Sequence, residues 1–226
     1  FLALWFNGAV GITFGDSLQN KAYANDHQEA YLPIPEVKAL ITDKASGKTL
    51  ASAEGGPLNL KRSKSSSGYP ISEIASFTQE IQDDGIKYIS TARFLTPISE
   101  EKLKELVQEG YEESVKESDG LEVYARVAIG VNWGPDKSTI QIQRGTFEVS
   151  QSNPLVSYSN AFYGMMQKAN YTSNTFNGKS LTIETGWPVD NFDAQVDAYT
   201  CGGAVGGEAM NFLTGEVFNF TFEIYF

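Results

Sequence analysis

Few side chains in this sequence are of the types that usually catalyse reactions. His27 is the only histidine and Cys201 the only cysteine, and no plausible base stands near the cysteine in the sequence. A catalytic triad or a histidine-based zinc site would therefore depend on one residue. The glycine-rich run at 202–207 lacks the Lys-Ser/Thr ending of a phosphate-binding loop. We predict no enzymatic activity, a buried Cys201, and glycines that let another backbone approach closely.

The densest group of potential oxygen ligands lies late in the chain, at Asp190, Asp193 and Asp197. Carboxylate oxygens are the ligands that hard cations such as calcium prefer. Asp193 and Asp197 would share the polar face of a strand expected over 192–200. The sequence therefore makes these three residues candidate ligands of a calcium ion. The alternative interpretation is that they form the acidic face of a strand that is exposed to solvent.

Two asparagines stand in the acceptor pattern for N-linked glycans, Asn170 before Tyr-Thr and Asn219 before Phe-Thr. Asn219 would lie on the polar face of its strand. Both are candidate glycosylation sites if the protein is exported.

Composition restricts the functional class. The chain has 226 residues, 41% of them hydrophobic and 12% aromatic, which is enough for one large β domain with its own core. The net charge of −11 argues against nucleic-acid binding, which needs a basic surface. No apolar run is long and continuous enough to predict a membrane-spanning helix.

The opening segment, residues 1–14, has the alternation of a long strand with one strongly apolar face. That face would carry Leu2, Leu4, Phe6, Val10, Ile12 and Phe14, with Gly8 interrupting it. Burying six such side chains contributes about 9–18 kcal/mol, against a net domain stability of about 5–15 kcal/mol. The segment must therefore dock, either in this chain's own sheet or in a groove of a neighbouring copy. Because the chain opens on Phe and the segment lacks a basic start, we expect a processed mature form rather than a signal peptide.

The rest of the chain predicts a mainly β fold. We expect the chain to divide into an N-terminal strand over 1–15, a polar tether over 16–35 and a single β-sandwich domain of jelly-roll type over 36–226. One amphipathic helix is expected after Thr96-Pro97, with an apolar stripe from Leu103 to Tyr111. The expected strands are 36–43, 49–53, 73–82, 86–95, 121–133, 139–144 with 146–149 after a break at Gly145, 155–171, 181–187, 192–200 and 216–226.

An apolar leading strand, a polar tether and a β-sandwich without disulfides together resemble a known class of protein. The chain is similar in this respect to donor-strand-complemented subunits of extracellular filaments, namely archaeal threads, bundling pili, cannula-type tubules and TasA-like matrix fibres. The resemblance implies a structural homopolymer at the cell surface. It implies that the apolar side chains of 1–14 are donor residues and that the acceptor crowds the backbone at Gly8. It also implies possible roles for glycans at Asn170 and for calcium at 190–197.

Two other functions remain open. The chain would alternatively be a secreted monomeric β-sandwich that binds carbohydrate or another ligand through exposed aromatic residues such as Trp133 or Trp187. We expect Trp133 in the core, however, because it continues the apolar face of its strand. A hydrolase on the same scaffold is the third possibility.

Overall fold

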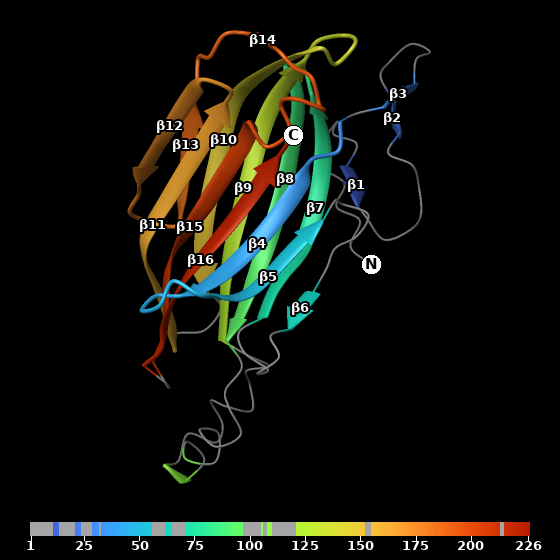
Figure 1. The fold of residues 1–226 in the computed structure, drawn as a ribbon. Coiled ribbons are helices and arrows are strands. Elements are labelled where there is room, and N and C mark those ends of the chain that lie inside the picture. Colours follow the sequence, from blue (N-terminus) through green and yellow to red (C-terminus); the bar gives the residue numbers. More distant parts are fainter. Residues whose placement is uncertain are drawn as a thin grey trace.

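In the computed structural model, the described residues are 11–13, 21–23, 29–31, 33–55, 62–64, 71–96, 105, 108–109, 121–151, 155–212 and 215–226. They form two large antiparallel sheets and a small two-stranded one (Figure 1). The mainly β fold predicted from the sequence is confirmed.

The eight-stranded sheet has the order β1-β7-β8-β9-β10-β13, with β6 paired to β7 and β14 paired to β10. Its strands are β1 (Gly11–Thr13), β6 (Arg62–Lys64), β7 (Ile71–Gln82), β8 (Gly85–Thr96), β9 (Leu121–Trp133), β10 (Thr139–Gln151), β13 (Ser180–Glu184) and β14 (Asp190–Asn191).

The six-stranded sheet has the order β12-β11-β15-β16-β4-β5. Its strands are β4 (Glu36–Asp43), β5 (Thr49–Gly55), β11 (Val156–Gln167), β12 (Asn170–Thr175), β15 (Cys201–Asn211) and β16 (Val217–Tyr225). The third sheet pairs β2 (Lys21–Tyr23) with β3 (Glu29–Tyr31), inside the segment predicted as a tether.

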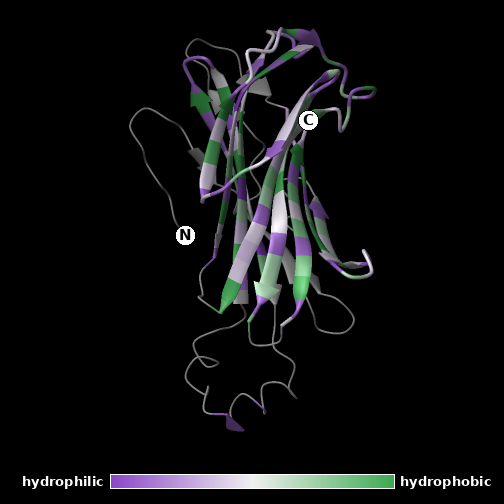
Figure 2. Cartoon of the chain, turned by 90° about the vertical axis from the view of Figure 1, so that its left-hand side faces the viewer, coloured by the Kyte–Doolittle hydropathy of each residue, from purple (hydrophilic) through white to green (hydrophobic). Residues whose placement is uncertain are grey.

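The hydrophobic core lies between the two large sheets, in a sandwich-like arrangement. Buried and more exposed residues alternate along the strands, so that Phe218, Phe220, Phe222 and Ile224 of β16 face inward. Apolar and polar residues accordingly follow one another along the strands in Figure 2. Rings from opposite sheets meet in the core: the Phe94 and Phe220 centroids lie 5.2 Å apart.

Several strand predictions are confirmed. β9 spans the predicted residues, and β7 and β8 form the predicted hairpin across Asp83-Asp84-Gly85, with Gln82 opposite Gly85. Gly85 has a φ of 145°, which side chains rarely adopt. The Asp-Gly signal was therefore a sound predictor of this turn.

Three strand predictions are wrong. The strand expected over 155–171 is a hairpin, β11 and β12, because Lys168 adopts a left-handed φ of 52° and turns the chain. β10 continues through Gly145, where a Cβ would lie 2.4 Å from Met165 Sδ, so that glycine serves packing rather than a break. Residues 194–200 form turns rather than a strand.

The opening segment is described only in part. Leu2, Leu4, Phe6, Gly8, Val10 and Phe14 lie outside the described residues. The described part, β1, pairs antiparallel with β7 of the same chain and places Ile12 opposite Gln79 at the edge of the eight-stranded sheet.

The predicted helix also lies almost entirely outside the described residues. Glu105 and Gln108 are helical, and Glu109 N donates to Glu105 O at 2.9 Å. The helix, the jelly-roll topology and the division into 1–15, 16–35 and 36–226 stay predictions. In the described part of the chain, no helix has the length and apolar character needed to cross a membrane.

Candidate functional site

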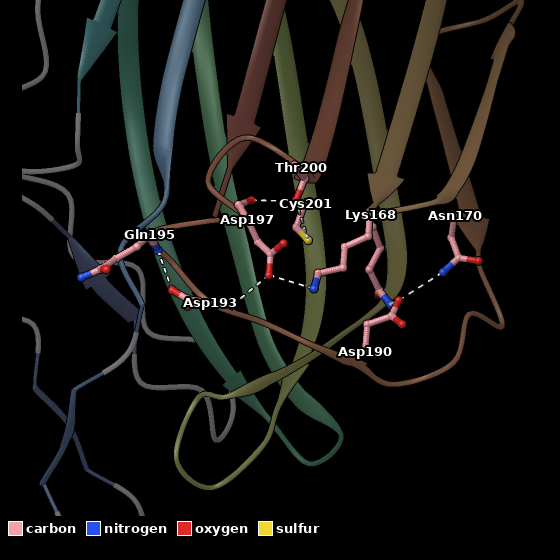
Figure 3. Close-up of polar contacts among 9 residues, drawn as sticks. Lys168, Asn170, Asp190, Asp193, Gln195, Asp197, Thr200 and Cys201 are labelled. Atoms are coloured by element: carbon pink, nitrogen blue, oxygen red, sulfur yellow. Dashed lines mark hydrogen bonds and ion pairs between the residues drawn. The ribbon is translucent and has the colours of Figure 1, made fainter.

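The predicted calcium ligands lie in and after β14, at one end of the two sheets (Figure 3). Asp190 Oδ2 accepts hydrogen bonds from Gln167 Nε2 at 2.7 Å and from Asn170 Nδ2 at 3.2 Å. Asp197 Oδ2 lies 2.8 Å from Lys168 Nζ. The hydrogen bond from Lys168 holds the pKa of Asp197 below its usual value, and Asp197 in turn raises the pKa of Lys168.

The loop 192–200 turns because its aspartates bind its own backbone. Asp193 Oδ1 accepts from Gln195 N at 2.9 Å, and Asp197 Oδ2 accepts from Asp193 N at 2.9 Å. Aspartate side chains compete with strand pairing in this way. Within the residues that the structure describes, no three side chains of His, Cys, Asp or Glu lie together in a way that could hold a metal ion. Calcium binding by Asp190, Asp193 and Asp197 stays a prediction, for which a fall in melting temperature on chelation is the test.

The other predicted positions have ordinary surroundings. Cys201 is a buried free thiol, as expected, and burial raises its pKa. His27 lies outside the described residues. Asn219 is half-buried on the outward face of β16, as predicted, and Asn170 donates to Asp190. Glycosylation of both stays a prediction.

A groove of about 580 Å³ lies on the outer face of the six-stranded sheet, over β12, β11, β15 and β16. Small residues of adjacent strands line it, Gly164 of β11 opposite Ala204 of β15. Aromatic side chains lie around them, and more than a third of the surface of several is exposed. These rings belong to Phe162 (37% exposed), Tyr171 (63%), Tyr199 (53%) and Tyr225.

Register explains why these residues meet. Met166 is opposite Tyr171, and Gly164 is opposite Ser173, so these side chains project from the same face of β11 and β12. On the other side, β16 carries Glu223 and Tyr225 at alternate, outward positions. Strands that are far apart in the sequence therefore contribute residues to one surface.

Tyr199 is held over the groove by strained backbone. Its φ is 68°, a left-handed conformation that costs a bulky residue about 1–3 kcal/mol. Its hydroxyl donates to Glu36 Oε2 at 2.9 Å, and this hydrogen bond raises the tyrosine's pKa. Its ring meets the Tyr225 ring edge-on, with centroids 5.4 Å apart. The loop 192–200 thus presents one ring at a defined place.

Glu223 is the acidic group of the groove. By register it lies between Ala204 of β15 and Lys38 of β4, and Lys38 faces Glu54 of β5. Burial is the main reason that the pKa of Glu223 is raised; Glu54 raises it further and Lys38 opposes the shift. A partly desolvated carboxylate beside exposed aromatic rings is able to bind a ligand with apolar and polar parts.

The outer face of the eight-stranded sheet has a different character. Its side chains form ion pairs across neighbouring strands: Arg126 with Glu148 at 2.9 Å, and Arg144 with Glu184. Thr146 and Thr182 share a hydrogen bond at 3.0 Å. These polar side chains pair with one another, whereas the groove on the opposite sheet exposes rings.

The aromatic residues proposed from the sequence are not those of the groove. Trp133 packs against Phe192 and Phe226, and its Nε1 donates to Tyr88 Oη at 2.9 Å, so that it lies partly buried against the core rather than within it. Trp187 is also partly buried against the core. The sequence did contain one signal for the groove. At the outward positions of β15, glycine and alanine alternate and leave room beside larger side chains.

Comparisons with known proteins do not add to this description. The sequence matches no protein-family model and no curated protein, and the fold matches no solved structure.

Proposed function

We propose that this chain is a non-enzymatic, extracellular binding protein that holds a small ligand in the groove on the outer face of its six-stranded sheet. The observation that carries the proposal is the set of exposed rings, including the strained Tyr199, around small residues of β11 and β15. Rings left in water at a cost in backbone strain are typical of a binding site.

The groove has the size and composition of a small-molecule site. Its volume of about 580 Å³ lies within the range of about 300–1,000 Å³ found for such sites. Ser173, Asn174, Thr175 and Glu223 add polar groups among the rings. A carbohydrate ring, with its apolar faces and hydroxyl edge, is one ligand of this type.

The three methionines of the chain make the test direct. Met166 and Met165 both contribute to the groove lining, although Met165 is buried, and Met210 lies outside the lining. In protein labelled with ¹³C-methyl methionine, a panel of soluble oligosaccharides and small amphipathic molecules is titrated and followed by NMR. A bound ligand should shift the Met166 signal and leave the Met210 signal in place.

Two glycine variants provide a matched comparison. Gly164→Val fills the groove, since a Cβ there meets nothing nearer than Tyr171 Oη at 3.9 Å. Gly130→Val makes the same change in the eight-stranded sheet, where the nearest atom is Arg144 Cβ at 3.6 Å. Binding should be lost only in Gly164→Val. The proposal would be contradicted if no compound of the panel shifted the Met166 signal, or if Gly164→Val and Gly130→Val bound a ligand equally well.

A second function, a filament subunit that polymerises by strand exchange, is favoured by one separate observation. Among the described residues, β1 pairs with Thr78–Glu80 of β7 and β6 pairs with Ile71–Glu73, so the outer edge of β7 accepts short added strands. The same pairing made by the opening segment of a neighbouring copy would be head-to-tail and would propagate. In this proposal the donor side chains are Leu2, Leu4, Phe6, Val10, Ile12 and Phe14. A jelly-roll-like sandwich, surface glycans and calcium at subunit contacts belong to it as well.

Deletion of residues 1–14 tests the second function. The full chain should form very large species on size exclusion and fibres under negative stain, and the deleted chain should stay monomeric. Fibres formed by the deleted chain, or a monomeric full chain, would exclude it.

A further inference from the structure

We propose that the ligand of the groove is an organic cation, with its ammonium group beside Glu223 and Tyr225 and its apolar body over Gly164 and Ala204. This inference rests on the proposed binding function and specifies the ligand's chemical class. It follows from the charges around the groove and from the side chains that the ligand would cover.

The charged residues at the β16 end of the groove are mainly acidic. A row across neighbouring strands reads Glu54, Lys38, Glu223 and Ala204. The adjacent row brings Glu36 opposite Tyr225. These two rows therefore contain three carboxylates and one ammonium group, that of Lys38, and of these charged residues Glu223 is the one in the groove lining. The net charge of the chain, −11, adds a long-range attraction for cations.

Covering the groove has a different energetic cost for each class of ligand. A neutral ligand would remove more water from Glu223, whose burial is already the main cause of its raised pKa. An anion would meet that carboxylate directly, and the groove lining contains no lysine or arginine in the part of the chain that the structure describes. A cation replaces the lost hydration with an opposite charge.

The aromatic side chains favour the same class. The faces of tyrosine rings carry negative potential and attract ammonium groups, most strongly where water is excluded. Tyr225 projects from the same side of β16 as Glu223, two residues away, and Tyr199 packs edge-on against it. A carboxylate and tyrosine rings thus lie together at one end of the groove, and the rest of its lining combines apolar residues with the polar side chains of Ser173, Asn174 and Thr175.

A matched pair of probes isolates the effect of charge. Choline and 3,3-dimethylbutan-1-ol have the same shape, but the second has carbon in place of nitrogen and carries no charge. Each is titrated into the full chain at pH 7, and the Met166 methyl signal is followed. Choline should bind about tenfold more tightly, the difference that a partly desolvated cation–π contact and a carboxylate provide.

Variants then assign the preference to Glu223. Glu223→Gln should reduce the advantage of choline to less than about twofold while binding of the neutral alcohol is retained. Glu208→Gln is the control, since Glu208 lies on the outer face of the same sheet but pairs with Lys44 at 2.7 Å. It should keep the full preference. An unchanged Met165 signal shows that each variant keeps its core.

Binding should also depend on pH, although choline stays charged throughout. Because the pKa of Glu223 is raised, the carboxylate takes up its proton at a higher pH than an ordinary glutamate, and choline affinity should fall there. The other charged groups facing it are Lys38 and Glu54, with Glu36 next to Tyr225. The fall should be absent in Glu223→Gln, in which these other groups are unchanged.

The outcomes separate this inference from the proposed function. If the alcohol binds as tightly as choline, or if an oligosaccharide moves Met166 and choline does not, the cation assignment is wrong and the groove remains a binding site. If neither probe and no member of the wider panel moves Met166, both proposals fail.

Discussion

Gln167 is a fully buried polar side chain whose hydrogen bonds all go to distant parts of the chain. Its Oε1 accepts from Ile142 N of β10 at 2.6 Å, and its Nε2 donates to Pro188 O at 2.8 Å and to Asp190. The Ile142 contact lies at the irregularity between Ile142 and Arg144 in the pairing of β10 with β9. Gln167 therefore joins the two sheets where regular pairing is interrupted.

Replacing Gln167 by leucine should be costly. Gln167→Leu leaves Ile142 N and Pro188 O without this partner in the protein interior, and we expect a loss of about 3 kcal/mol in unfolding free energy. Urea denaturation measures it. Gln141→Leu is the control, because it removes a single hydrogen bond, to Trp187 O, at a partly buried position. Equal losses in the two variants would contradict the importance given to Gln167.

Glu223 should affect stability as well as binding. A folded-state pKa above the usual 4.5 means that ionisation of Glu223 destabilises the folded form, and that this penalty grows as the pH rises through the raised pKa. Glu223→Gln should therefore raise the melting temperature at pH 7 and have little effect at pH 4. Thermal unfolding at the two pH values is the measurement. Glu208, whose pKa is lowered by Lys44, should show no such gain on replacement by glutamine.

At the scale of the element, β15 shows how glycine sets the distance between strands. A Cβ at Gly206 would lie 2.6 Å from Phe220 O, which is backbone, and 2.6 Å from Phe162 Cζ. A Cβ at Gly203 would lie 2.7 Å from Ile129 Cδ1 of the opposite sheet. The glycines of 202–207 thus permit close approach on both faces of one strand, as the sequence suggested.

An alanine comparison tests this explanation. Gly206→Ala should destabilise the protein by about 1–3 kcal/mol, because a backbone oxygen cannot move aside cheaply. Gly164→Ala, on the neighbouring strand and with no atom nearer than 3.9 Å, should be neutral or mildly stabilising. Urea unfolding of both variants gives the difference, and a neutral Gly206→Ala would remove the close-approach argument.

At the scale of the whole molecule, the question is whether the opening segment stays with its own chain. Thr13 is opposite Thr78 in the pairing of β1 with β7, so cysteines at these positions can report the partner. In a Cys201→Ser background, Thr13→Cys with Thr78→Cys should give an oxidised monomer if β1 pairs at home. Strand exchange should give a ladder of covalent multimers on non-reducing gels.

An internal control belongs to the same experiment. Thr146 and Thr182 are opposite each other in β10 and β13, and cysteines there should always close within one chain. If both cysteine pairs give an oxidised monomer, the filament proposal is excluded. If the pair at Thr13 and Thr78 alone gives a ladder of multimers, β1 is not a permanent part of the sheet of its own chain.

The sequence by itself was sufficient for the strands whose side chains alternate over many residues. β9, β16 and the β7–β8 hairpin were predictable because a period of two is local and because Asp-Gly favours a tight turn. The same reasoning correctly predicted that Cys201 is buried and that Trp133 packs against the core. It failed at 192–200, where aspartate side chains bind their own backbone and override alternation.

Only the tertiary structure decided where the candidate site lies. The groove joins outward positions of β11, β12, β15 and β16 with Tyr199, and these become neighbours through pairings between segments far apart in the chain. Outward residues are selected neither by burial nor by local propensity, so a pattern within one strand, such as the small residues of β15, does not show which residues of other strands join them. The raised pKa of Glu223 has the same origin, since burial and its neighbours Glu54 and Lys38 arise from strand order. Alternation determines which side of a strand faces the core, and strand order determines which residues meet on the other side.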